Sequence, residues 1–328
     1  MNIVQETNIF LKSIKPSIPL KLSGLFGFGF KTLSIFYIKS LNSNARCVVE
    51  NIHSAKSKIY RLCKNKNVLK IFPSLIKNTL KWKNNIIINI DFSDFQGFMV
   101  LMLAMQTKRG RALPLFFDIL TYPIKKGSQN IFIIKVIKAF LKLVSKNVSF
   151  VFDRGFACPS IIEYLARRRI IFYIRIKSCK FVGNAKCGNQ KVKTFSAGKH
   201  KVKAYGHNLC LVVSPNKENT KEPWYIITND FIKSAEEICD IYYHRFEIEE
   251  FFKDAKYLYG LEKIQFKTAR TLKMVLWFII LGFWFLSEVK EFANNWLRLK
   301  WKDVSYYLYC FEKIAFIFKN TYLSAISP

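Results

Sequence analysis

Residues 242–256 read YYHRFEIEEFFKDAK, and this stretch decides how the rest of the chain is interpreted. On a helix, at about 100° per residue, polar side chains spaced by three, four and seven residues fall within roughly a 60° arc. These side chains are Tyr242, Arg245, Glu249 and Lys256, and beside them runs an apolar strip of Ile248, Phe251, Phe252 and Ala255. A row of this kind can hold a metal ion and grip phosphates. An amphipathic helix with an ordinary ion pair needs no function, so this stretch alone leaves both interpretations open.

The charge of the chain points to an anionic partner. Among 328 residues, 53 are Lys or Arg and 22 are Asp or Glu, which gives a formal net charge of +31. A compact protein with this excess repels itself unless it binds polyanions. Nucleic acid is therefore the expected partner, ahead of an anionic membrane surface. An AT-rich codon bias would explain many lysines but not the shortage of acids.

Cysteine usage and hydropathy bear on the location of the protein. The eight cysteines are scattered, without a C-x-x-C pair or zinc-finger spacing, which favours reduced thiols. The first 30 residues lack the order of a signal peptide. The most apolar run, residues 274–286, is too short to span a bilayer comfortably and is expected to form a buried helix. We therefore expect a cytoplasmic, nucleoid-associated protein and no membrane partner.

Two aspartates follow apolar runs that read as buried strands. Asp91 follows residues 86–90, and Asp153 follows residues 148–152. Neighbouring strand ends would bring these carboxylates together, and Glu249 can approach from the helix. Three carboxylates in one place repel one another unless cations lie between them.

Carboxylate oxygens suit Mg²⁺ or Mn²⁺, and two such ions, about 4 Å apart, can drive an in-line phosphoryl displacement. Asp94 competes with Asp91 as the ligand; we favour Asp91 because it directly follows the strand. The alternative for either aspartate alone is a turn-capping role.

The pattern around these aspartates predicts a mixed α/β layer. Strands are expected over 86–90, 98–105, 113–120, 148–152 and 170–176, and helices over 131–144 and up to about Arg168. Short strands of a β insertion are expected over 191–195, 202–205, 209–213 and 224–228, with a polar loop at 216–219. One helix is expected to start at a capping box of Ser234 and Glu237 and to end near Gly260.

The N-terminal part is expected to be helical, with a turn at GLFGFGF, residues 24–30. Residues 54–65 look like a short basic helix with Ile59 and Leu62 facing inward. It is either the second helix of a helix-turn-helix or a solvated helix face. The resulting organisation is a helical N-terminal region (1–80), a first part of the α/β core (81–178), a β-rich insertion (179–231), a core helix carrying Glu249 (232–262) and a helical C-terminal region (263–328).

Four motifs of the chain resemble the insertion-sequence-four family of DDE transposases. They are Ile90-Asp91-Phe92-Ser93, GRALPL at 110–115, Asp153-Arg154-Gly155-Phe156, and Tyr-x2-Arg-x3-Glu-x6-Lys at 242–256. The last motif is the most specific, and the resemblance covers about residues 54 to 290.

The resemblance implies a ribonuclease-H-like catalytic core with a β-strand insertion between the second and third acids. It implies that Asp91, Asp153 and Glu249 bind two Mg²⁺ or Mn²⁺ ions. It also implies that Tyr242, Arg245 and Lys256 hold phosphates of the transposon end at a hairpin step. On the same resemblance, residues 1–80 bind the DNA ends, residues 81–178 and 232–262 form the catalytic core, and the protein assembles as a homodimer on DNA.

Three further residues are assigned DNA contacts by the same resemblance or by their charge. Trp224 would stack on an extruded base, with packing against the core as the alternative. Arg154 and Arg175 would line the DNA path, although salt bridges within the fold explain them equally well.

The function expected from these motifs is a DNA transposase that cuts at the ends of its own insertion sequence and joins the 3′ ends to target DNA. One alternative is a catalytically idle, transposase-derived DNA-binding repressor, which would not need the acids. Another is a structure-selective nuclease, which would keep the acids but would not need the Tyr, Arg and Lys of the last motif.

Overall fold

The computed structural model describes residues 18–33, 51–80, 85–121, 127–144, 147–184, 188–215, 222–257 and 259–296. The expected polar loop at 216–219 lies outside these ranges. The chain divides into two compact units. The sheet unit contains residues 82–93 and 99–250, and the helical unit contains residues 1–81, 94–98 and 251–328. Each unit is described by itself.

One ten-stranded sheet organises the sheet unit. Its strand order is β3 (Leu113–Thr121), β2 (Phe98–Met105), β1 (Ile86–Phe95), β4 (Val148–Phe152), β5 (Ile171–Arg175), β10 (Tyr225–Thr228), β9 (His207–Val213), β8 (Gly198–Ala204), β6 (Phe181–Asn184) and β7 (Gly188–Lys191). Strands β1, β4 and β5 run parallel to one another, whereas β10 runs antiparallel to both β5 and β9. The expected mixed α/β layer is confirmed.

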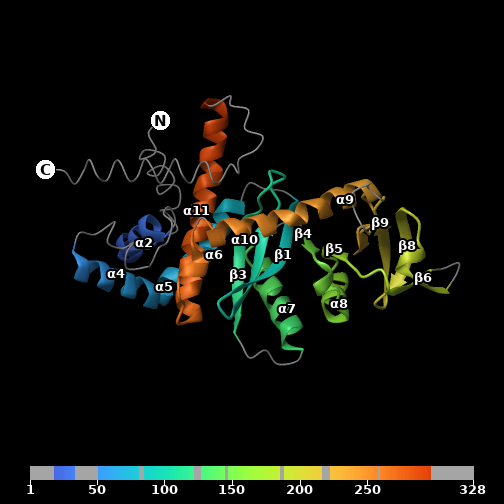
Figure 1. Ribbon diagram of the computed structural model, residues 1–328, viewed down its shortest axis with the longest axis horizontal. Coiled ribbons are helices and arrows are strands. Elements are labelled where there is room, and N and C mark those ends of the chain that lie inside the picture. The colour runs from blue at the N-terminus through green and yellow to red at the C-terminus, as the bar shows by residue number, and fades with distance from the viewer. Residues whose placement is uncertain are drawn as a thin grey trace. The chain divides into compact units, whose positions relative to one another are not determined.

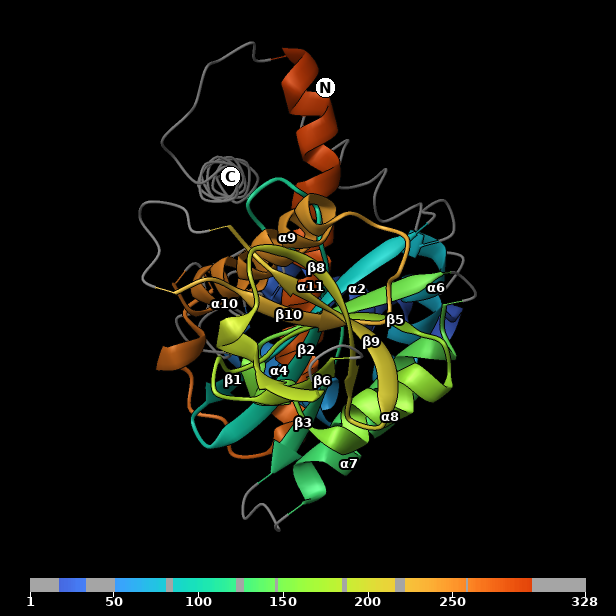
Figure 2. The same cartoon turned by 90° about the vertical axis from the view of Figure 1, so that its right-hand side faces the viewer.

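Helices cover both faces of this sheet. Phe150 of β4 contacts Phe140 of α7 (Ser128–Leu141), with ring centroids 6.4 Å apart. The next residue, Val151, packs in a cluster with Ile238 and Tyr242 of α9 (Ala235–Tyr243). Because successive strand residues point to opposite faces, α7 and α9 lie on opposite sides of the sheet. Figures 1 and 2 show this arrangement, with α8 (Pro159–Arg167) beside α7.

The insertion continues the core sheet instead of forming a separate layer. Strand β10 pairs with core strand β5 on one side and with β9 on the other. The strand expected at 191–195 is wrong, because β7 ends at Lys191 and Val192–Thr194 form a 3₁₀ turn. Val192 is fully buried there, so its apolar side chain reflects packing of the turn and not a strand face. Strand β6 was not expected from the sequence.

The helical unit packs around aromatic residues. It contains α2 (Leu20–Leu33), α4 (Ile52–Lys64), α5 (Lys66–Leu69), α6 (Phe72–Leu80) and α11 (Ala269–Trp296). The turn expected at GLFGFGF is wrong, because α2 runs through it. A Cβ on Gly29 would lie 2.4 Å from the ring of Phe278. Gly29 therefore allows α2 and α11 to approach closely, a role that a local pattern does not reveal.

Two other expectations for the helical unit are confirmed. Helix α4 is capped by the side chain of Asn51, and both Ile59 and Leu62 are buried in it. The helix-turn-helix role of α4 stays a prediction, since residues 34–50 before it lie outside the described ranges. The apolar run is buried from Met274 to Trp284 within α11. Across the described ranges, no helix is both long and apolar enough to cross a bilayer.

Candidate active site

Two of the expected acids lie side by side at the end of a parallel strand ladder. The register of β1 and β4 ends with Ile90 opposite Phe152, so Asp91 and Asp153 follow on neighbouring strands. Strand β1 continues to Phe95 instead of ending at Ile90; it is the pairing with β4 that ends there. An oxygen of Asp91 accepts the amide of Phe92 at 2.8 Å.

Asp94, the competing ligand, serves a different purpose in the described structure. Its Oδ1 accepts the amide N–H of Gly97 at 3.3 Å, within the turn that leads from β1 to β2. Gly97 has a φ of +85°, a conformation that favours glycine. Asp94 therefore caps this turn.

The third acid lies beyond a break in the expected helix. Helix α9 ends at Tyr243, a 3₁₀ turn spans His244–Phe246, and α10 spans Glu247–Tyr257. The prediction of one continuous helix is therefore wrong. At this break, the side chain of Asn89 donates hydrogen bonds to the carbonyl oxygens of His244 and Arg245 at 2.9 and 3.4 Å.

Arg245 connects two of the acids. Its Nη2 lies 2.7 Å from Oε1 of Glu249, and its Nη1 lies 3.6 Å from Oδ2 of Asp91. The hydroxyl of Tyr242 donates to Oδ1 of Asp153 at 3.4 Å. The structure thus brings five of the expected site residues together, although the helix expected to carry Tyr242, Arg245 and Glu249 is broken. The Nε of Arg245 is buried and has no hydrogen-bond partner among the described residues.

The electrostatics of Asp91 reflect its neighbours. The pKa of Asp91 is raised to about 6, chiefly by burial and in smaller part by the charges of Glu249 and Asp153, whereas the Phe92 amide and Arg245 oppose the shift. Burial disfavours the charge of Arg245, but Tyr242, Glu249 and Asp153 outweigh burial and raise the pKa of Arg245. The charges of Glu249 and Asp153 therefore act on the carboxylate of Asp91.

The donors that this cluster offers to a divalent cation are carboxylate oxygens. Within the described residues, no group of three His, Cys, Asp or Glu side chains is arranged to hold a metal ion. Arg245 instead supplies positive charge between Asp91 and Glu249. The donor chemistry nevertheless fits, because carboxylate oxygens suit hard cations. A cation would also offset the charges of Glu249 and Asp153, which add to burial in raising the pKa of Asp91.

Trp224 stands next to this cluster. Its ring meets the ring of Tyr242 edge-on, with centroids 5.2 Å apart, and lies 6.4 Å from that of Phe246. It also lines a cavity of about 460 Å³. The other lining residues are Ser214, Pro215, Glu236, Cys239, Asp240 and Tyr243. Trp224 therefore packs against the core and also borders an open space.

The remaining basic residues are placed differently from one another. Arg154 is exposed and directly follows Asp153. Arg175 forms an ion pair with Glu222 at 3.9 Å. This agrees with the alternative interpretation of Arg175, a salt bridge within the fold. Lys256 lies on α10, and its Nζ is 3.3 Å from Oε1 of Glu262 and 5.6 Å from the ring centroid of Phe95.

Sequence reasoning missed two buried polar residues near the acids. Asn89 is fully buried in β1, and Glu247 is 4% exposed at the start of α10. The signal for Asn89 was present, since a lone amide interrupts the apolar run IIINI at 86–90. Glu247 had no such signal, because it lies among other acids in FEIEE.

Comparison with known proteins gives one family. The family described as "Transposase DDE domain" matches residues 119–284, just over half of the chain. No curated protein sequence matches the chain. A solved structure with similarity is that of piggyBac transposase in a synaptic complex with hairpin DNA, at 10% identity and a TM-score of 0.43. The match covers 80% of this chain and 59% of that one.

Proposed function

The chain belongs to the transposase DDE domain family, and on that premise we propose that it is the DNA transposase of an insertion sequence. The observation that carries the proposal is the meeting of Asp91, Asp153 and Glu249 around Arg245. A ribonuclease-H-like core is part of the proposal. Three parallel strands, β1, β4 and β5, with β2 and β3 continuing the sheet beyond β1, support it.

The three acids would hold the divalent ions that DDE transposases generally use. Mg²⁺ or Mn²⁺, as a pair of ions, supplies activation of an attacking hydroxyl and stabilisation of the leaving oxygen. Asp91 and Asp153 would contribute oxygens from the ends of paired strands, and Glu249 would contribute one from the first turn of α10. The reaction is an in-line phosphoryl transfer that cuts the element ends, first by water and then by the freed 3′-OH.

Arg245 is proposed to bind a phosphate of the transposon end. Its buried Nε has no acceptor among the described residues, and leaving such a donor unpaired costs about 1–3 kcal/mol. A phosphate oxygen would satisfy this donor and would exchange for one of the carboxylates that Arg245 now contacts. Tyr242, which donates to Asp153, and Lys256, seven residues after Glu249 on α10, are proposed to hold neighbouring phosphates.

Trp224 is proposed to stack on a base extruded at the hairpin step. Its edge-on contact with Tyr242 places an aromatic surface beside the acid cluster. The adjacent cavity of about 460 Å³ falls within the range of small-molecule sites, roughly 300–1,000 Å³. Arg154, exposed and next to Asp153, is proposed to contact the DNA backbone.

Assembly and location complete the proposal. The net charge of +31 supports binding to transposon ends and target DNA. We propose a homodimer on DNA, with the N-terminal region binding the ends, in a cytoplasmic and nucleoid-associated setting.

A labelled duplex carrying the DNA that flanks the gene tests the proposal. The purified chain is incubated with this duplex and Mg²⁺, and the products are separated on a denaturing gel. Nicks at the element boundary and a hairpin product are expected from the wild type and from Glu250→Gln. Both products should be absent with Glu249→Gln. Metal-independent binding without cleavage would contradict the proposal and favour a repressor, and nicks without a hairpin would favour a nuclease.

A further inference from the structure

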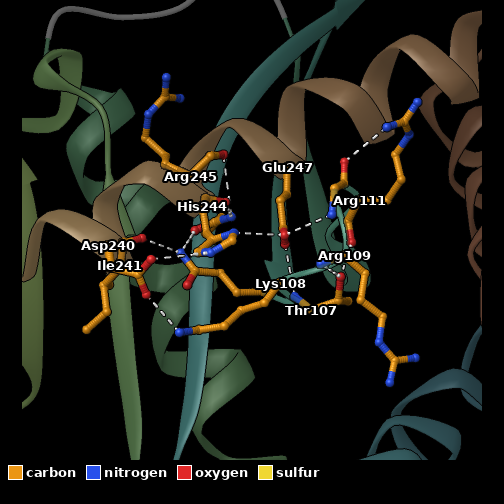
Figure 3. Close-up of polar contacts among 12 residues, drawn as sticks. Thr107, Lys108, Arg109, Arg111, Asp240, Ile241, His244, Arg245 and Glu247 are labelled. Atoms are coloured by element: carbon orange, nitrogen blue, oxygen red, sulfur yellow. Dashed lines mark hydrogen bonds and ion pairs between the residues drawn. The ribbon is translucent and has the colours of Figure 1, made fainter. Parts of the chain in front are cut away.

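A buried carboxylate that the proposed chemistry does not use lies two residues before Glu249. Glu247 is 4% exposed and is the first residue of α10. Its Oε2 accepts the amide N–H of Thr107 at 2.9 Å, and its Oε1 accepts the amide N–H of Gly110 at 3.2 Å. Oε1 also lies 3.1 Å from Nδ1 of His244. Figure 3 shows Glu247 at the centre of these contacts.

The contacts of Glu247 attach the turn between β2 and β3 to the first turn of α10. The main chain adds a further bond, from the amide of Ala112 to the carbonyl oxygen of Glu247 at 3.1 Å. The turn is itself braced, since Oγ1 of Thr107 donates to the carbonyl of Arg111 at 2.6 Å. Gly110 has a φ of +83°, which lets the turn present its amide. Hydrogen bonds to a carboxylate are stronger than neutral ones, so this attachment is a firm one.

Asn89 is the counterpart of Glu247 on the strand that carries Asp91. It is fully buried and lies two residues before Asp91, hence on the same face of β1. Its Nδ2 donates to the carbonyl oxygens of His244 and Arg245, at 2.9 and 3.4 Å, where the helix is broken. Its Oδ1 accepts from Nε2 of Gln106 at 2.7 Å. This side chain joins β1 directly to the segment that leads into α10.

We propose that Asn89 and Glu247 are positioning residues that fix Glu249 relative to Asp91. Each lies two residues before an acid, and each bonds the segment at the start of α10 to the sheet or to its β2–β3 turn. Without them, the first turn of α10 would shift, and the Glu249 carboxylate with it. A misplacement of about 1 Å at a reacting centre costs roughly a hundredfold in rate. The inference rests on the proposed function in taking Glu249 as the third acid.

The test compares Glu247→Gln and Asn89→Leu with the wild type and a matched control. Glutamine keeps the length of Glu247 but replaces one acceptor oxygen with a donor that faces an amide N–H. The control is Glu163→Gln, which removes a half-exposed acid of α8 whose ion-pair partner, Arg167, lies on the same helix. Three measurements concern function: single-turnover nicking in Mg²⁺, DNA affinity without metal, and Mn²⁺ affinity by calorimetry. Two concern the fold: thermal unfolding and amide hydrogen exchange of residues 246–252.

In both variants, the rate of nicking and the affinity for Mn²⁺ are each expected to fall about 10- to 100-fold. Losses of this size are typical when a residue that supports a metal ligand is replaced. DNA affinity without metal should fall much less than nicking, because most of the positive charge that binds DNA lies outside this segment. Exchange at residues 246–252 should be faster. Nicking, Mn²⁺ affinity and exchange like those of the control would overturn the proposal. So would a fall in DNA affinity equal to the fall in nicking, since that would indicate general loss of the fold.

Failure of the proposed function gives a different result. A wild type without metal-dependent nicking would refute the transposase assignment. Hydrogen exchange decides the positioning role even then, because unchanged exchange of residues 246–252 in Glu247→Gln would overturn it. Should Asn89→Leu fail to fold, Glu247→Gln carries the same comparison.

Discussion

Replacing Asp91 with asparagine is expected to stabilise the metal-free protein at neutral pH. Burial raises the pKa of Asp91 from 3.8 to about 6, and its side chain is 22% exposed. One pKa unit corresponds to about 1.4 kcal/mol, so ionised Asp91 disfavours the folded state by about 3 kcal/mol. Because the pKa of Asp91 is higher in the folded state, the carboxyl group adds no penalty to the folded state below about pH 3.8. The free energy of unfolding then decreases as the pH rises through about 6.

Urea denaturation in the presence of a chelator measures this effect. Asparagine keeps an acceptor for the Phe92 amide but never ionises, so it avoids the penalty at every pH. About half of the penalty is present at about pH 5, so the stability of Asp91→Asn relative to wild type should rise by about 1.5 kcal/mol from about pH 5 to about pH 8. A relative stability that stays constant or falls over this range would refute the reasoning.

Three other substitutions have expected outcomes. Gly29→Ala should lower the free energy of unfolding by about 1–3 kcal/mol, and with it the thermal midpoint, since its Cβ would meet the Phe278 ring. In the control Gly155→Ala, the new Cβ meets nothing within 4 Å, so the thermal midpoint should stay unchanged. Equal midpoints for both variants would contradict the packing argument. Burial opposes ionisation of Asp230, but hydrogen bonds to its carboxylate outweigh burial and lower its pKa. Asp230→Asn should therefore lower the free energy of unfolding by about 1–3 kcal/mol near pH 7. The difference in unfolding free energy between this variant and the wild type should become smaller as the pH falls through the lowered pKa. A difference that grows in acid would contradict this. Trp224→Ala should reduce the ratio of hairpin to nicked product on a denaturing gel by about 10- to 100-fold, as expected for loss of one base stack. Trp224→Phe should keep a ratio close to that of the wild type. An unchanged ratio in Trp224→Ala would assign Trp224 to core packing.

The sequence predicted the parts of the site that depend on local patterns. Apolar runs ending in Asp91 and Asp153 predicted neighbouring strands, because buried parallel strands have few polar residues. The spacing of Tyr242, Arg245 and Glu249 predicted that they share a surface, and it survives the 3₁₀ turn between α9 and α10 because that turn still advances the chain by nearly helical steps.

The sequence did not predict features that depend on distant partners. The helix break at His244–Phe246 is accompanied by hydrogen bonds from Asn89, more than 150 residues earlier. Glu247 resembles a solvated acid until the amides of the β2–β3 turn surround it. Gly29 resembles a turn residue until the Phe278 ring is placed beside it. In each case, a tertiary contact outweighs the local propensity.

The most direct test of the central claim is whether the three acids act as one catalytic centre. Single-turnover cleavage of the labelled end duplex in Mg²⁺ would be measured for Asp91→Asn, Asp153→Asn, Glu249→Gln and the triple variant. Residues that act as a unit are strongly non-additive, so each single variant should lose about a thousandfold or more in rate, and the triple variant should be no slower than the slowest single one. A single variant that cleaves at the wild-type rate, or losses that multiply in the triple variant, would contradict the claim.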